Sequence, residues 1–156
     1  MDRVSRDKRS AIMASIKCKD TAPEMALRRY LHGLGFRYRL HGNLPGKPDL
    51  VFRRAGVAVF VNGCFWHGHG CRRSNQPKTN SDYWVNKIAV NINRDVRSRK
   101  LLEKQGWTVF TIWECEIEQD IVDAAQPLVD CLERAREGLT RGSTRLASLA
   151  GYPQER

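Results

Sequence analysis

The sequence predicts an α/β fold, with one mixed β-sheet and helices packed against it. Amphipathic helical stretches alternate with short apolar runs along the chain, in the order helix, strand, hairpin, helix, strand, helix. The length of 156 residues suggests a single domain, which is large enough to bury a core without disulfides. We place this domain at residues 1–137, followed by a loose tail at 138–156.

The N-terminal part predicts an arm, a helix and a strand. Residues 1–20 are rich in charges of both signs and read as an arm that carries a short helix. Thr21 and Glu24 have the spacing of a capping box, and Pro23 suits the first turn of the helix that follows. The alternating pattern at residues 36–40 then predicts a strand.

The middle of the chain predicts a hairpin and a long helix. The apolar runs DLVF and VAVFV are joined by RRAG and should pair as two strands. Residues 62–80 form a loop rich in Gly, His and Cys, and Ser81 is the expected N-cap of a helix that reaches about Gln105. The expected buried stripe of this helix is Ile88, Ile92 and Val96.

The C-terminal part predicts a buried strand and a last helix. The strand is WTVFTIW, which follows the helix-ending Gly106. The helix covers residues 118–137, although it contains Pro127, a residue that disfavours a helix interior.

The charge balance favours a polyanionic partner. Lys and Arg total 27 against 17 Asp and Glu, a net charge of +10, which points to DNA or RNA first and to an anionic membrane second. No apolar run is long enough to span a membrane, and the N-terminus has no apolar signal segment. We therefore expect a cytoplasmic protein, in which the five cysteines stay reduced.

Four soft side chains indicate a metal site. Cys64, His69 and Cys71 lie within eight residues, and Cys115 directly follows the last predicted strand. Thiolate and imidazole are the ligands that structural zinc prefers, so a closed Cys3His site is expected. His67 competes with His69 for the fourth place. The alternative is that Cys64 and Cys115 are small buried hydrophobic residues.

A second group of residues indicates a nuclease. PGKPDL places Asp49 at the start of a strand that pairs with VAVFVN, and two such strands are the skeleton of the restriction-endonuclease-like, PD-(D/E)xK fold. An Asp with a carbonyl and waters can hold Mg2+ for phosphodiester hydrolysis. The acid and lysine of that pattern are missing here, so His67 is the candidate general base. The alternative is a surface histidine of the metal loop.

Five stretches together resemble the very-short-patch repair (Vsr) endonucleases, bacterial enzymes of this fold. The stretches are DKRSAIMASIKCKDTAPE, LPGKPDLVF, VFVNGCFWHGHGC, YWVNKIAVNINRDVR and GWTVFTIWEC. The family nicks one strand of DNA on the 5′ side of the T in a T:G mismatch, which arises when 5-methylcytosine deaminates. The resemblance implies a Mg2+-dependent strand-specific mismatch endonuclease with structural Zn2+.

The resemblance also implies a role for individual residues. Asp49 and the backbone carbonyl of Val61 would hold Mg2+, His67 would be the general base, and Glu24 would orient a metal-bound water, unless it serves only as a helix cap. Cys64, His69, Cys71 and Cys115 would bind zinc. The DNA contacts implied are wedges from Phe65, Trp66 and Trp84, entry of Met13 from the minor groove, and contacts of Lys87 and Asn91 with the mismatched pair. The alternative for Phe65 and Trp84 is a place in the core.

Asn62 departs from the family pattern, which has a histidine at this position. That histidine helps to position the hydrolytic water or the phosphate. Asn62 can hydrogen-bond in its place but cannot take a proton, which leaves proton transfer to His67.

The expected partners are double-stranded DNA with a T:G mismatch, MutL and a repair polymerase, and the protein is expected to be a monomer that binds no membrane. Two other functions remain open: a restriction-type nuclease of the same fold, and a zinc-stapled DNA-binding module without catalysis.

Overall fold

The computed structural model describes residues 19–40, 42–75 and 80–149, and only the helical backbone of 140–149. The N-terminal arm, with Met13, lies outside the described residues. The elements in chain order are α2 (Ala22–Gly33), β1 (Arg39–Leu40), β2 (Leu50–Phe52), β3 (Val57–Asn62), the 3-10 helix η1 (Arg72–Ser74), α3 (Ser81–Lys104), β4 (Thr108–Trp113), α4 (Glu114–Gln119) and α5 (Ile121–Leu149). No helix among the described residues is long and apolar enough to cross a membrane.

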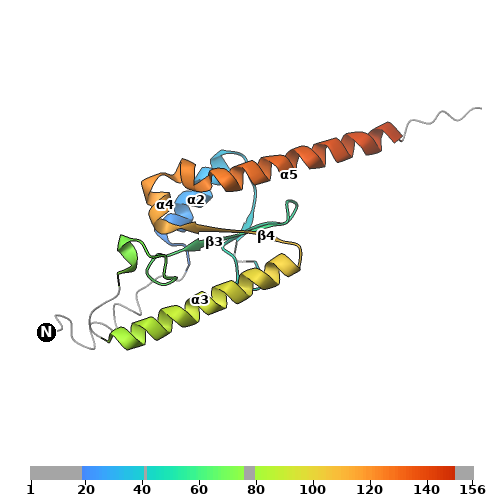
Figure 1. Cartoon of the computed structure of the whole chain (residues 1–156). Helices are drawn as coiled ribbons and strands as arrows, with labels where there is room; N and C mark the ends of the chain where they lie inside the picture. The colour runs from blue at the N-terminus through green and yellow to red at the C-terminus, as the bar shows by residue number, and fades with distance from the viewer. Residues whose placement is uncertain (1–18, 41, 76–79, 150–156) are drawn as a thin grey trace, which may run out of the picture.

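The four strands form one mixed sheet in the order β1-β2-β3-β4. The first three are antiparallel neighbours, and β4 is parallel to β3 after the crossover through α3. The predicted hairpin is confirmed, with Leu50 opposite Val59 and Phe52 opposite Val57. A three-layer sandwich results, in which α3 covers one face of the sheet and α2, α4 and α5 cover the other (Figure 1). The predicted α/β class with a mixed sheet is therefore confirmed.

Alternation along β3 divides the core between the two faces of the sheet. Val57 and Val59 point toward the larger cluster, together with Leu27 and Leu31 of α2 and Leu128 and Leu132 of α5. Ala58 and Phe60 point the other way and pack near Leu102 of α3 and Val109 of β4. Asn62 continues this second set, so its side chain lies on the α3 side of the sheet.

The strand expected at 36–40 is reduced to Arg39 and Leu40. Phe36 packs in the core instead, where its backbone N–H closes the end of α2 by donating to Leu31. Helix α2 begins at the expected place, with Pro23 in its first turn. The predicted capping box is wrong, because the Thr21 side chain makes no hydrogen bond to the backbone of the first turn. Its hydroxyl donates to the Glu24 carboxylate instead, and that carboxylate accepts the backbone N–H of Asp20.

The length of α3 was predicted correctly, but its cap and its buried stripe were not. Asn80, in a left-handed conformation, precedes the helix, whereas Ser81 is its first residue. Ile88 is buried, whereas Ile92 and Val96 are 38% and 47% exposed. The buried residues are Trp84, Ile88, Asn91, Ser98 and Leu102. The prediction counted apolar residues only, and two positions of the true stripe hold polar side chains.

The last predicted helix is two helices. The short α4 follows β4 directly, and Asp120 then caps α5 by accepting the N–H groups of Val122 and Asp123 at 2.8 and 3.2 Å. Pro127 lies inside α5, on its exposed side, where water can reach the carbonyl that its missing N–H leaves without a helical donor. The end predicted at residue 137 is wrong: α5 continues to Leu149, so residues 138–149 of the expected tail are helical. The stretch from Arg134 is rich in Arg, Leu and Ala, which favour helix.

Candidate active site and metal centre

The hairpin brings the Asp49 carboxylate to the backbone of Val61. The Asp49 N–H donates to the Val59 carbonyl at 2.9 Å, and Asp49 Oδ2 accepts the Val61 N–H at 2.8 Å. The N–H and C=O of one residue in a strand point to the same side, so the Val61 carbonyl also faces the Asp49 side. The two oxygen ligands expected for a hard cation therefore lie on one side of β3.

His67 is paired with a residue that the sequence analysis did not single out. Its Nδ1 lies 2.5 Å from Oδ2 of Asp95 on α3. A carboxylate only accepts hydrogen bonds, so Nδ1 carries the proton and Nε2 presents its lone pair. This tautomer is the one a general base requires. Asp95 lies four residues after Asn91, in the gap of the buried stripe between Asn91 and Ser98; this spacing is the signal that could have found it.

Helix α3 also holds the loop that carries His67. The Asn91 amide, 8% exposed, donates to the Trp66 carbonyl at 2.9 Å. Gly68 has φ +64°, and a Cβ there would meet Ile92 Cδ1 at 2.8 Å and Ile88 Cγ2 at 3.0 Å. The loop backbone thus lies against the ends of two side chains of α3, and the positive φ of Gly68 favours glycine at this contact. Asn91, predicted to contact a base pair, is engaged here in holding the loop, while Lys87, one helical turn earlier, is exposed.

The predicted aromatic wedges form one cluster. Phe65 lies 5.0 Å from Trp66 and 5.3 Å from Trp84 between ring centroids, in edge-to-face contacts. Phe65 and Trp66 are half-buried, and Trp84 is 7% exposed beneath them. Tyr83, which the sequence analysis omitted, adds an exposed ring 5.2 Å from Trp84. The burial of Trp84 agrees with the alternative that it belongs to the core, whereas Phe65 and Trp66 are partly exposed.

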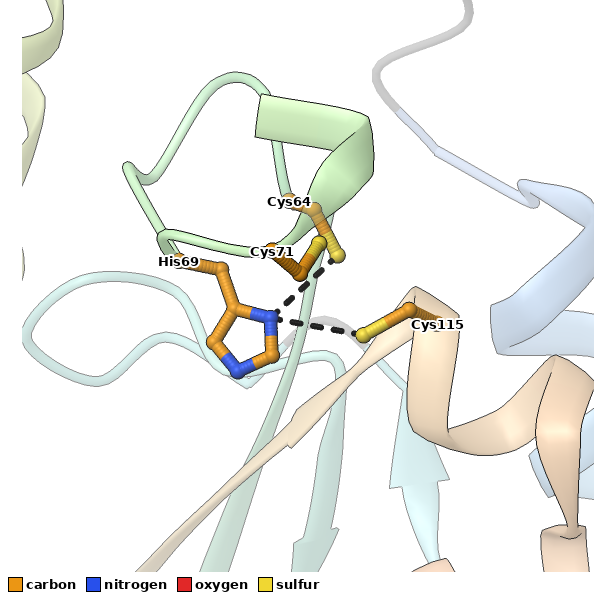
Figure 2. Close-up of side chains that lie close together, drawn as sticks. All are labelled: Cys64, His69, Cys71 and Cys115. Carbon is orange, nitrogen blue, oxygen red and sulfur yellow. Dashed lines mark hydrogen bonds between the residues drawn. The ribbon is translucent and has the colours of Figure 1, made fainter. Parts of the chain in front are cut away.

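The four predicted soft ligands converge at the ends of β3 and β4. The ligand atoms of Cys64, His69, Cys71 and Cys115 all lie within 4.8 Å of one another, and these residues could hold a metal ion. Figure 2 shows dashed lines from the sulfurs of Cys64 and Cys115 to Nδ1 of His69, with the sulfur of Cys71 beside that of Cys64. Nδ1 lies 3.6 Å from Cys64 Sγ and 3.3 Å from Cys115 Sγ. His67 is not part of this group, because its ring faces Asp95 instead.

The thiols of this cluster differ in acidity. Burial raises the pKa of Cys64 to about 12 and also raises the pKa of Cys115. Burial opposes ionisation of Cys71 as well, but the backbone N–H of Arg73 and contacts with His69 and the other thiols lower its pKa to about 6. Three thiols this close cannot all ionise without a cation among them, because like charges repel.

Two further contacts attach the segment that carries His69 and Arg73 to the sheet and to α4. The His69 ring stacks on Trp113, with centroids 4.2 Å apart and planes 11° from parallel. Arg73 forms ion pairs with Glu114 and Glu118 of α4, which raise the pKa of its guanidinium. Helix η1 is therefore held by charge pairs next to the cluster, and Cys115 is held by the helix that carries those acids.

Glu24 is occupied by the N-terminus of its own helix. Its carboxylate accepts from the Asp20 N–H, the Thr21 hydroxyl and Arg28 Nη2, each at 3.0 Å. Glu24 and Arg28 are both buried, and Arg28 also pairs with Asp20. These bonds give Glu24 a complete structural role at the N-terminus of α2.

Asn62 is also buried and stands in β3 beside Trp113 of β4. Its side chain lies on the α3 side of the sheet, which is the side to which alternation along the strands assigns Asp49.

The family model described as "DNA mismatch endonuclease Vsr" matches residues 1–73. The type II nicking enzyme V.XorIIP of Xanthomonas oryzae pv. oryzae is 47% identical over 117 residues, which cover 74% of this chain and 86% of that protein. The chain belongs to the Vsr family. The DNA mismatch endonuclease Vsr of Escherichia coli K12 is 39% identical over 110 residues, 70% of each chain. The type II nicking enzyme V.NmeAIP of Neisseria meningitidis serogroup A is 41% identical, covering 78% of this chain and 87% of the relative.

Among solved structures, the catalytic domain of the homing endonuclease I-Bth0305I has a TM-score of 0.52 and 23% identity. It covers 74% of this chain and 98% of that domain, and the likeness supports the fold alone. With the four-stranded mixed sheet, it confirms the endonuclease fold predicted from the sequence. As a Vsr family member, this chain is an endonuclease of the mismatch-endonuclease and nicking-enzyme group that acts on DNA.

Proposed function

We propose that this Vsr-family member nicks one strand of duplex DNA on the 5′ side of the T in a T:G mismatch, with Mg2+ as the catalytic cation. The observation that carries the proposal is the pairing of Nδ1 of His67 with Asp95 at 2.5 Å, on the side of the sheet to which Asp49 belongs. A base with a fixed tautomer and an oxygen ligand set are the two parts that metal-assisted hydrolysis needs. The names of relatives include both a mismatch endonuclease and nicking enzymes, which agrees with this reaction.

Asp49 and the Val61 carbonyl are the residues that would hold Mg2+. When bound there, Mg2+ supplies charge stabilisation to the phosphate and acidifies water. His67 Nε2 accepts the proton of the attacking water, and Asp95 stabilises the resulting imidazolium. The water oxygen bonds to phosphorus, the P–O bond to the leaving sugar oxygen breaks, and that oxygen takes a proton from solvent. Asn62 would orient the water or the phosphate, and Glu24 would orient a water of the site from the N-terminus of α2, unless it serves only that helix end.

We propose Zn2+ for the cluster of Cys64, His69, Cys71 and Cys115. A tetrahedral zinc with Zn–S of about 2.3 Å and Zn–N of about 2.05 Å places sulfur and nitrogen about 3.5 Å apart. The two distances from His69 Nδ1 to sulfur, 3.6 and 3.3 Å, fall on either side of that value. The role of the ion is structural, because all four places are filled by protein. It fixes the loop that presents Phe65, Trp66 and His67.

The aromatic cluster of Phe65, Trp66 and Trp84 serves as the wedge that opens the mismatched step. Unstacking a step costs a few kcal/mol, and a mismatched step is already weakened. The exposed Lys87 and the arm with Met13 reach the DNA beside it, and Asn91 acts on the mismatch through the loop it holds. The expected setting is the bacterial cytoplasm, with a monomer that meets MutL and a repair polymerase.

A nicking assay on duplexes that differ only in T:G, T:A or C:G at one position tests the proposal. Zinc-loaded protein should nick the T:G duplex in one strand when Mg2+ is added and leave paired duplexes intact. Cleavage of both strands of a paired site would favour a restriction-type nuclease, and mismatch binding without any nick would favour a DNA-binding module. Asp49→Ala should abolish nicking, and His67→Ala should slow it by about 10²- to 10⁴-fold with mismatch binding retained.

A further inference from the structure

A groove runs along the outer edge of β4, away from the proposed DNA-binding residues. It has a volume of about 630 Å³, and its lining includes Val109, Thr111, Arg99, Glu116, Asp120 and Asp123. Among the described residues, β4 is the last strand of the sheet, and no strand pairs with its outer side. Figure 1 shows α4 and α5 on one side of the sheet and α3 on the other, with β4 between them. The groove thus has a strand edge as its floor and helices as its walls.

The backbone of β4 offers hydrogen bonds to this groove. The Thr108 N–H donates toward β3, to the Gly56 carbonyl at 2.8 Å, so Thr108, Phe110 and Ile112 face the sheet. Val109 and Thr111 must then face outward. The Val109 carbonyl does so, because it accepts from Arg99 Nη2 at 2.7 Å. The N–H and C=O of Thr111 and the N–H of Val109 remain directed into the groove. A row of such groups is a template for a further strand.

The wall formed by α4 and α5 carries charge opposite to that of the protein as a whole, whereas the α3 side contributes Arg99. Glu116, Asp120 and Asp123 line the side formed by α4 and α5, in a chain whose net charge is +10. One oxygen each of Glu116 and Asp120 accepts a backbone N–H, but their charges remain and are exposed. Such a surface repels the DNA backbone and attracts cationic side chains. A second copy of this basic chain would meet general electrostatic repulsion instead.

We propose that this groove binds an extended basic segment of a partner protein, which adds to β4 as a fifth strand. Alternation in the added strand turns every second side chain toward α4 and α5. Lys or Arg at those positions meets Glu116, Asp120 and Asp123, and backbone bonds form with Thr111. The DNA-cleaving side stays free, so a partner held here and a DNA substrate can be bound together. The inference concerns a different surface from the proposed nicking reaction and does not depend on it.

The test uses the full chain labelled with 15N, without DNA, and an eight-residue peptide of alternating Lys and Val, capped at both ends. Its titration should shift the amide resonances of Val109 and Thr111 and slow hydrogen exchange at Thr111 at least tenfold. The Phe110 amide, already bonded toward β3, is the internal reference. A peptide of alternating Glu and Val should not bind, and a Lys–Val peptide with N-methylated central residues should bind at least tenfold more weakly.

Two variants locate the site on the protein. Asp123→Lys should weaken binding of the Lys–Val peptide at least tenfold, whereas Glu133→Lys, an exposed charge reversal on α5 outside the groove, should not. Thr111→Pro removes the outward N–H, a change that an edge strand tolerates, and should abolish strand addition. Circular dichroism and thermal unfolding check that both variants fold, and neither residue belongs to the nicking machinery.

Several results would overturn the proposal. Protection of the Thr111 amide in the free monomer would mean that the chain's own residues cover this edge. Concentration-dependent dimerisation that protects the same amide would assign the groove to a second copy. Equal binding of the Lys and Glu peptides, shifts confined to other surfaces, or no binding up to about 1 mM would show that the groove does not select a basic strand.

Discussion

Asp95→Asn is the sharpest test of the His67–Asp95 pair. Asparagine keeps the size of the side chain but loses the charge, so His67 is no longer held in one tautomer and its imidazolium is no longer stabilised. A hydrogen bond to a charged group is worth about 1.5–3 kcal/mol, a rate factor of roughly 10 to 150. The two side chains are 21% and 33% exposed, so solvent weakens the bond. We therefore expect a loss of about 10- to 50-fold in the rate of nicking.

The measurement is the single-turnover nicking rate of a T:G duplex across a pH series, beside mismatch affinity from a gel-shift titration. The affinity should stay within about threefold of the unaltered protein, since Asp95 contributes to the chemical step and not to the wedge. Glu103→Gln, on the same helix and in an exposed pair with Arg99, is the matched control and should change neither value. An unchanged nicking rate in Asp95→Asn, or an equal loss of binding and rate, would refute this account of His67.

Two further predictions concern the loop. Uptake of zinc by the metal-free protein at pH 7.5 should release about two protons, from Cys64 and Cys115, because Cys71, with a pKa of about 6, is already largely ionised. Zinc affinity should fall as the pH falls, since protons then compete for all three thiols; an indicator-dye titration measures both, and uptake without proton release would contradict the assignment. Gly68→Ala should lower the nicking rate and the melting temperature more than Gly70→Ala, because both have positive φ but only Gly68 abuts α3. Differential scanning calorimetry with the nicking assay compares the two, and equal effects would mean that the contact with Ile92 does not matter.

Much of the fold could be predicted from the sequence, because in most elements the local sequence signals agree with the pattern of burial. The hairpin, β4 and the extent of α3 were found from apolar runs, from turn residues and from Gly106, each of which acts over a few residues. The error in the stripe of α3 has a clear cause. Asn91 and Asp95 face inward to bond the loop, so the buried face of the helix is polar where a periodicity search looks for apolar residues.

The four soft ligands could be grouped from the sequence because cysteine and histidine are rare and chemically distinctive. Their meeting requires only that β3 and β4 end at the same edge, as parallel neighbours do. Residue chemistry alone does not single out Asp95 from the other two acids of α3, Asp82 and Glu103, and only its helical spacing from Asn91 distinguishes it. Its importance depends on the place of His67, which is set by the loop and by glycine at position 68. The groove at β4 could not be predicted either, because it depends on which edge of that strand has no neighbouring strand among the described residues.

The double attachment of the loop to α3 bears on how enzymes of this kind can be retargeted. Asn91 holds the Trp66 carbonyl and Asp95 holds His67, one helical turn apart. A change at Asn91 made to alter base preference should therefore also loosen the segment that carries His67, the proposed general base. Engineered specificity at this position should come with slower cleavage, and recovering the rate would require compensating changes in residues 65–69 and not at the bases themselves.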